Sequence, residues 1–322
     1  MEHKRLQNSI AESRLALPIL SIITIAVWIS LCFINSKTIP ATICLLFTSY
    51  LMVELNNSNV LMRVYSRMVS CSFMFLTTIF LYQLTQIGSA ILILCIVGFL
   101  TCIFRTYQDS ETQGWTFYAF ICIGISSIVW VQILYFVPIL WILMKTNLLS
   151  LNIKSFISSI FGLILPNIIF FGYTLYITNN YTTYIRHINE LIAFQDIFNF
   201  TNLSEKQLIS TIWIIILAII STIHYLIDKK NDNIKTRLLF GIFTIINWSA
   251  IIFLLLQPTL FSSLITIIIS TSSPLIAHLI TLTHSKLSNI LFKLIVLISI
   301  FIIIYNFTNL QILKNAIETI GF

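Results

Sequence analysis

Charged residues are scarce in this chain, and this scarcity is its most informative property. Only 9% of the 322 residues are Asp, Glu, Lys or Arg, whereas 58% are hydrophobic and the mean hydropathy is +0.96. A soluble core of this length has no room for so much apolar surface, so hydrocarbon is the expected environment. The composition therefore predicts an all-α integral membrane protein with a single polytopic domain over residues 1–322.

Cysteine pairs and catalytic signature motifs are missing as well. The sequence has no CxxC, P-loop, Gly-rich nucleotide motif, HExxH or GxSxG, so neither a cofactor nor a metal site is expected. No series of carboxylates crosses the apolar runs, which argues against a proton pump or ion-coupled transporter. The six cysteines all lie in apolar runs, where they are expected to pack as small apolar residues: Cys32, Cys44, Cys71, Cys95, Cys102 and Cys122.

The net charge of +7 comes from basic residues that are scattered singly and in pairs over many breaks between apolar runs. Such scatter is typical of cytoplasmic loops in a membrane protein, not of a nucleic-acid-binding surface. Membrane lipids are therefore the expected partners, and nucleic acid is not. The apolar runs predict spans at about 16–34, 40–54, 67–84, 89–104, 155–177, 209–227, 238–256, 263–283 and 288–306.

The stretch 117–144 contains 28 residues without a charge, whereas one spanning helix needs roughly 20. It forms either one long tilted helix or two short helices that turn near Trp130, Gln132 and Pro138. With two helices and a cytoplasmic amino terminus, the 18 basic residues divide 14 inside to 4 outside; with one helix they divide 9 to 9. Because basic residues concentrate on the cytoplasmic side, the hairpin is favoured.

The hairpin gives about 11 membrane helices, with the amino terminus in the cytoplasm and the carboxyl terminus outside. Helices of about 14 residues do not cross a hydrocarbon layer of about 30 Å. Their free backbone ends must be shielded by neighbouring helices, because lipid offers them no hydrogen bonds. The short hairpin therefore predicts a packed bundle around an internal feature.

The order of helices and turns resembles a known architecture. The segment 37–78 shows a helix, a short basic turn and a returning helix. The segment 104–171 adds a polar turn, the 117–144 hairpin and a helix with the motif GLILP at 162–166, and the segment 228–280 ends in SPLIAHL at 273–279. Together these resemble a reduced GT-C fold, and the chain is similar over most of its length to an uncharacterised family of bacterial polytopic membrane proteins.

The GT-C fold belongs to membrane glycosyltransferases that use polyprenyl-phosphate sugars. The resemblance implies a location in the bacterial inner (cytoplasmic) membrane and a polyprenyl-phosphate-linked sugar or another membrane protein as partner. GT-C enzymes have acidic residues in the first outer loop, but that loop here, from Asn35 to Pro40, contains no carboxylate. Glu54, the nearest acid, is expected at the opposite end of the next span, so no catalytic residue is transferred from the family.

The outer segment 177–208 is the longest polar stretch and the first place to look for a site. Arg186 and Glu190 are spaced to pair on one helix face, as are His187 and Glu190. One interpretation is an amphipathic helix that lies on the outer membrane interface. The other is an acceptor or lipid-phosphate site built from Arg186, His187 and Glu190, with Asp196 as a further candidate acid.

A second group of charges is expected on the inner side: Arg63, Arg67, Arg105, Asp109 and Glu111. Arg63 and Arg67 could hold a lipid phosphate, because guanidinium groups fork onto phosphate oxygens. The alternative is that they only fix the orientation of the chain in the membrane.

Two histidines fall inside expected spans. His224 stands four residues before Asp228, so a local hydrogen bond between them is expected. His278 lies deeper, after Pro274, which removes a backbone donor from its helix; the preceding hydroxyls of STSS are expected to satisfy the freed carbonyl. His278 either lines a polar cavity as a ligand-binding residue or packs against a neighbouring helix.

Three hypotheses follow. The first is a GT-C-like protein without glycosyltransferase catalysis that binds a lipid-linked intermediate or a membrane partner. The second is an active transferase that uses Glu190 or Asp196, and the third is a small transporter or flippase. The empty first outer loop favours the first hypothesis.

Overall fold

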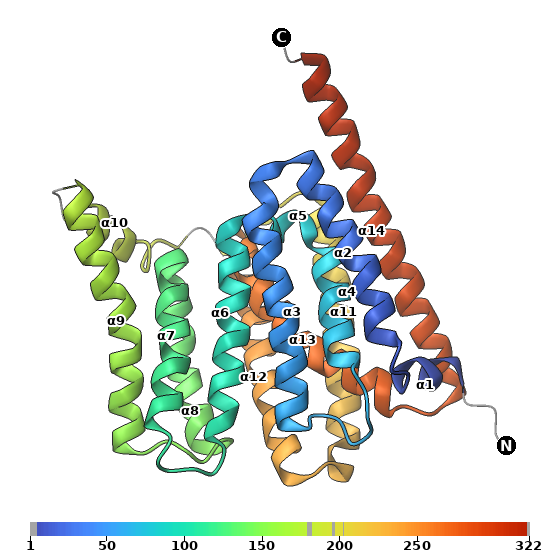
Figure 1. Ribbon diagram of the computed structural model, residues 1–322, viewed down its shortest axis with the longest axis horizontal. Helices are drawn as coiled ribbons and strands as arrows, with labels where there is room; N and C mark the ends of the chain where they lie inside the picture. Colours follow the sequence, from blue (N-terminus) through green and yellow to red (C-terminus); the bar gives the residue numbers. More distant parts are fainter. Residues whose placement is uncertain (1–4, 179–181, 195–196, 202, 321–322) are drawn as a thin grey trace.

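The computed structural model describes residues 5–178, 182–194, 197–201 and 203–320, and within these ranges the chain is helical with no strand. Figure 1 shows the helices side by side in one bundle. The α-helices are α1 (Leu6–Ala11), α2 (Ala16–Ile34), α3 (Ile39–Asn59), α4 (Met68–Ile79), α5 (Leu81–Leu84), α6 (Ile87–Ile103), α7 (Gln113–Val129), α8 (Val137–Thr146), α9 (Ile153–Thr178), α10 (Thr182–Asn189), α11 (Glu205–Asp228), α12 (Ile234–Leu256), α13 (Phe261–Leu282) and α14 (Lys286–Ile320). Short 3-10 turns are η1 (Ser36–Thr38), η2 (Phe104–Thr106), η3 (Val131–Phe136), η4 (Lys229–Asn231) and η5 (Pro258–Leu260).

Eight helices in the described part of the chain are long and apolar enough to cross a membrane, and they correspond to α2, α3, α6, α9, α11, α12, α13 and α14. This confirms the prediction of a multi-pass helical membrane protein. Three further apolar segments, Met68–Ile79, Gln113–Val129 and Val131–Thr146, are shorter than a span. By length, only eight helices in the described residues qualify as membrane spans, so the predicted count of about eleven membrane helices is not confirmed.

The span expected at 67–84 is divided, because α4 ends at Ile79 and the one-turn helix α5 follows Phe80. The hydroxyls of Thr77 and Thr78 both donate to the carbonyl oxygen of Met74, at 2.9 and 2.7 Å. Such hydroxyl bonds compete with the regular backbone ladder and often bend a helix. The apolar run alone does not indicate this break.

The stretch 117–144 contains two helices, as the charge distribution predicts. Helix α7 ends at Val129, Trp130 takes an extended conformation, and η3 leads into α8 with Pro138 in its first turn. Proline is tolerated there because the first amides of a helix have no intrahelical acceptor. The 10-residue α8 is too short to cross a hydrocarbon layer of about 30 Å.

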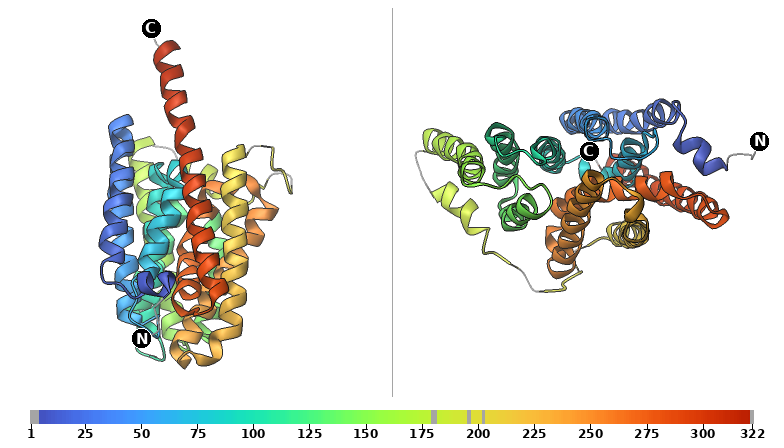
Figure 2. Two further views of the ribbon diagram at one scale, coloured as in Figure 1. Left: turned by 90° about the vertical axis from the view of Figure 1, so that its right-hand side faces the viewer. Right: turned by 90° about the horizontal axis from the view of Figure 1, so that it is seen from below.

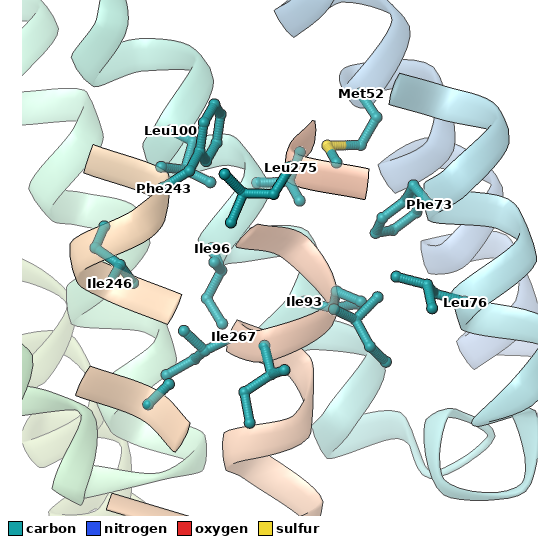
Figure 3. Packing of buried hydrophobic residues seen from close by; sticks show 14 of the residues in the cluster. Met52, Phe73, Leu76, Ile93, Ile96, Leu100, Phe243, Ile246, Ile267 and Leu275 are labelled. Atoms are coloured by element: carbon teal, nitrogen blue, oxygen red, sulfur yellow. The ribbon is translucent and has the colours of Figure 1, made fainter. Parts of the chain in front are cut away.

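Helix α13 is the centre of the bundle. It contacts α4, α6, α11 and α12, and every residue from Leu264 to Thr281 is buried. Figure 3 shows Met52 of α3, Phe73 of α4, Ile96 of α6 and Ile246 of α12 in the core around its residues. Pro274 has no backbone N–H to donate to the carbonyl of Ser270, four residues before it. As expected, a nearby hydroxyl replaces this donor: Ser273 donates to the carbonyl oxygen of Ser270 at 3.3 Å.

The loops divide between two ends of the bundle. In Figure 1 the segments 60–67, 104–112, 147–152, 229–233 and 283–285 lie at the lower end, whereas η1 and α10 lie at the upper end. Figure 2 shows the same division from the side, with α1 at the lower end and the end of α14 at the upper end. We call the lower end the basic end, because its segments and the adjoining helix turns contain Arg14, Arg63, Arg67, Arg105, Lys145, Lys154, Lys229, Lys230, Lys235, Arg237 and Lys286.

Candidate functional site

Five ionisable side chains meet at the basic end, between the 60–67 loop, the end of α11, the η4 turn and α13. We call them the histidine–aspartate cluster: Arg63, His224, Asp228, Asp232 and His278. The sequence singles out Arg63 and His278 separately as candidate ligand-binding residues. The structure joins them through one carboxylate.

Asp232 is the centre of the cluster, and its side chain is only 3% exposed. Its Oδ1 atom lies 3.0 Å from Nε of Arg63, and its Oδ2 atom lies 3.0 Å from Nε2 of His278. The Nη2 atom of Arg63 donates to Oδ2 of Asp228. Asn231 donates to the other oxygen of Asp228 at 2.7 Å. One guanidinium thus connects two carboxylates.

His278 is fully buried on α13. Its Nδ1 lies 3.3 Å from Nδ1 of His224, which is half-buried on α11. The rings of Tyr225 and Phe240 pack on His278 with centroids 5.7 and 4.8 Å away. Because one ring nitrogen faces a carboxylate, the network assigns the proton of neutral His278 to Nε2. Its Nδ1 then accepts the Nδ1–H of His224.

Local structure explains why Arg63 and Asp232 reach this place. Val60 takes a left-handed conformation (φ 50°), which ends α3 and turns the chain back. The Asn56 amide holds the carbonyl of Ser66 at 3.0 Å, and the Ser66 hydroxyl donates to the carbonyl of Ala11 at 2.7 Å. Asp232 stands just before the first turn of α12, where the helix dipole favours a negative charge.

Within residues 5–178, 182–194, 197–201 and 203–320, no group of three His, Cys, Asp or Glu residues is placed to hold a metal ion. The side chains of the cluster instead form a chain of pairwise contacts. The arrangement suits proton transfer, since an aspartate that fixes one nitrogen of a histidine leaves the other to exchange protons.

The other charges expected on the inner side are not part of the cluster. Arg105 lies 3.5 Å from Glu54 and stacks over Trp115 at 4.5 Å from the ring centroid. Arg67 donates to the Tyr65 hydroxyl at 3.0 Å. Asp109 accepts the backbone N–H of Glu111 at 2.9 Å. The predicted inner group therefore consists of separate local contacts, and within this group only Arg63 reaches a buried acid, Asp232.

His224 differs from its prediction. Its hydrogen-bonding partner is His278 on α13, not Asp228 one turn along α11. The carboxylate of Asp228 instead accepts hydrogen bonds from Arg63 and Asn231. The spacing of four residues between His224 and Asp228 predicts a bond within α11, but spacing within one helix carries no information about a partner on another helix, here His278 of α13.

The outer segment packs against the α7–α8 hairpin. His187 on α10 lies 2.9 Å from the carbonyl oxygen of Ser127 and 3.7 Å from the Glu190 carboxylate, so the expected His187–Glu190 contact is present. Gln132 donates to the backbone carbonyl of Glu190 at 2.7 Å. The Glu190 side chain is 58% exposed, and Arg186 is exposed as well. Asp196 lies outside the described residues.

An apolar groove runs between α1, α2, α4, α11, α13 and α14 and encloses about 350 Å³. We call it the α2–α14 groove. Ile10 and Ser13 line its part near the basic end. Ala16 and Leu20 of α2, Ile280 of α13 and Phe292 of α14 line its walls.

Asp232 is the site residue that the sequence analysis missed. It stands in KKNDN, a charged break that is typical of a solvated turn, and no spacing rule links it to Arg63 or His278. The one signal that could have indicated Asp232 is its position beside the inner ends of two spans, from which a carboxylate can reach an intramembrane histidine.

No known family model, curated protein or solved structure matches this chain.

Proposed function

We propose that this integral membrane protein binds an anionic lipid-linked intermediate, with the chain of the lipid in the α2–α14 groove and its phosphate at the basic end. In this proposal the basic end faces the cytoplasm of a bacterial cell and the eleven apolar helices, including the short hairpin, form a GT-C-like bundle without glycosyltransferase catalysis. The partner class is a polyprenyl phosphate or its sugar-linked form.

The observation that supports this proposal is the α2–α14 groove. Its volume of about 350 Å³ lies in the range of ligand sites in proteins. Its lining is apolar apart from Ser13 and Ser72. A hydrocarbon chain is the ligand that such a lining accommodates without unpaired polar groups.

Charge at one end of the groove favours an anionic headgroup. Arg14 follows the lining residue Ser13, and Arg67 precedes the lining residue Met68. Arginine forks onto phosphate oxygens, and each basic residue near an anionic surface contributes roughly 1 kcal/mol.

Catalysis is not proposed because, among the residues that the structure describes, no outer carboxylate is suitably placed to support it. The first outer turn, η1 with its flanking residues, contains no acid. The Glu190 carboxylate is exposed and contacts His187. The backbone carbonyl of Glu190 accepts a hydrogen bond from Gln132, which lies in the turn between α7 and α8. No observation favours the transporter hypothesis over lipid binding.

The test is lipid retention by the purified chain. The protein is reconstituted in phosphatidylcholine nanodiscs that contain a small fraction of undecaprenyl phosphate, and bound lipid is measured by native mass spectrometry. Wild type is expected to retain undecaprenyl phosphate, and Ala16→Trp is expected to reduce retention about tenfold because the indole fills the groove.

The matched control is Ala26→Trp, which places the same indole on the exposed face of α2 outside the groove. Arg14→Gln with Arg67→Gln should reduce the preference for the phosphate lipid over a neutral polyprenol, whereas Lys145→Gln at the same end should not. Equal retention in Ala16→Trp and Ala26→Trp would refute the proposed site.

A further inference from the structure

We propose that Asp232, His278 and His224 form a one-proton relay, which carries a proton from the basic end to the fully buried imidazole of His278 on the central helix α13. The ligand of this site is a proton. The relay is independent of the lipid site, because the groove lining includes none of its residues.

The hydrogen bonds define the starting state. Asp232 accepts Nε2–H of His278 at 3.0 Å, and His278 Nδ1 accepts Nδ1–H of His224 at 3.3 Å. The remaining nitrogen, Nε2 of His224, then has a free lone pair and makes no hydrogen bond within the described part of the chain. Because His224 is half-buried and His278 is not exposed, His224 is the entrance.

The proton step balances without any co-reactant. A proton binds to the lone pair of His224 Nε2 while the Nδ1–H proton of His224 passes to Nδ1 of His278. His224 returns to a neutral form that is protonated on Nε2, and its Nδ1 now accepts the new Nδ1–H of His278. The positive charge thus rests on His278, next to the carboxylate of Asp232, and no water has to enter the core.

The charges around the pair explain why it takes one proton and not two. The groups that face it are Asp228 at the end of α11, Asp232 in the turn before α12, and Arg63 from the 60–67 loop. With neutral histidines these three sum to one negative charge, which a single proton neutralises. A second proton would place two imidazolium rings 5.3 Å apart between centroids, where like charges repel strongly.

The cluster can stay assembled when the proton arrives. Asp232 uses Oδ1 for Arg63 and Oδ2 for His278, so a charged His278 strengthens one contact without displacing the other. Tyr225, whose ring packs on His278, has its hydroxyl engaged with the carbonyl of Arg237 at 2.8 Å and does not compete for the proton.

The test is nitrogen NMR of the full-length protein in nanodiscs, with ¹⁵N-labelled histidine. At high pH, His278 is expected as the Nε2–H form and His224 as the Nδ1–H form. As the pH falls, His278 should become doubly protonated while His224 changes to the Nε2–H form, with one proton taken up by the pair. Two independent titrations, or the opposite starting form of His278, would overturn the relay on the native chain alone.

A variant series isolates the entrance. The amide of His224→Gln can still donate to His278 but cannot pass a proton on, so exchange of the His278 ring proton with solvent, measured by NMR, should be markedly slower than in wild type. His284→Gln, which changes a histidine outside the pair that contacts Asn8, is the control and should leave the exchange rate at His278 unchanged. An unchanged exchange rate at His278 in His224→Gln would contradict the proposal.

Discussion

Two acidic residues show how burial decides the energetic role of a single side chain at the basic end. Asp232 and Glu54 each face an arginine, but the side chain of Asp232 is 3% exposed and that of Glu54 is 42% exposed. In water-accessible positions an ion pair contributes little, because both partners keep their hydration. In a buried position the loss of one partner leaves the other charged and unpaired.

At the residue scale, therefore, Asp232→Asn is expected to reduce the free energy of unfolding by about 3 kcal/mol. It removes the charge that both Arg63 and His278 face. Glu54→Gln, the matched isosteric change at the exposed Arg105 pair, should alter it by less than about 1 kcal/mol. Unfolding by sodium dodecyl sulfate in mixed micelles measures both variants, and equal losses would contradict the assignment of Asp232 as the centre of a buried network.

At the scale of elements, glycines set how closely α7 and α9 approach. A Cβ atom on Gly162 would lie 2.6 Å from the carbonyl oxygen of Phe117 and 3.0 Å from Cβ of Phe120. One on Gly124 would lie 2.9 Å from the carbonyl oxygen of Leu163 and from Pro166. In a membrane, where lipid is as apolar as the helix surface, close packing of small residues is a main source of helix association.

Gly162→Ala is accordingly expected to destabilise the fold by about 2 kcal/mol, because the methyl group meets backbone atoms of α7 that cannot move independently. Gly172→Ala is its control in the same helix, since a Cβ there meets nothing within 4 Å. That change should be neutral or stabilise by up to about 1 kcal/mol through helix propensity. The comparison uses the same mixed-micelle unfolding, and similar losses in both variants would exclude a specific α7–α9 contact.

The whole molecule is organised by the segregation of basic residues to one end. Helices α7 and α8 return the chain to the end from which α7 starts, so the loops on both sides of the hairpin lie together. Asn152 donates to the carbonyl of Ser110 across these two loops at 2.6 Å. If 117–144 crossed the membrane once, the two loops would be on opposite sides.

This topology predicts that Ser110→Cys and Leu149→Cys react with a membrane-impermeant maleimide from the same side of sealed vesicles. Both positions are exposed, on either side of the hairpin. Lys37→Cys, in the η1 turn at the other end, should react only from the opposite side. The unsubstituted chain measures the background labelling of the six native cysteines. Labelling of positions 110 and 149 from opposite sides would contradict the hairpin.

The sequence by itself determined the fold class and most helix positions. Hydrocarbon offers no hydrogen bonds, and a helix satisfies its backbone polar groups within its own segment, so apolar runs of about 20 residues predict helices. The division of 117–144 was also accessible, because basic residues mark one side of the membrane. The break at Phe80 was not, since it depends on hydroxyl bonds inside an otherwise apolar run.

Only the tertiary structure decided the site. Arg63 and Asp228 are 165 residues apart in the chain, and Asp232 and His278 are 46 apart. Which loop meets which helix end follows from the lateral packing around α13, and hydrophobic periodicity holds no information about that packing. The sequence indicates Arg63 and His278 as separate candidate residues. Asp232 joins them only because the packing of the helices brings the turn before α12 next to α13 and the 60–67 loop.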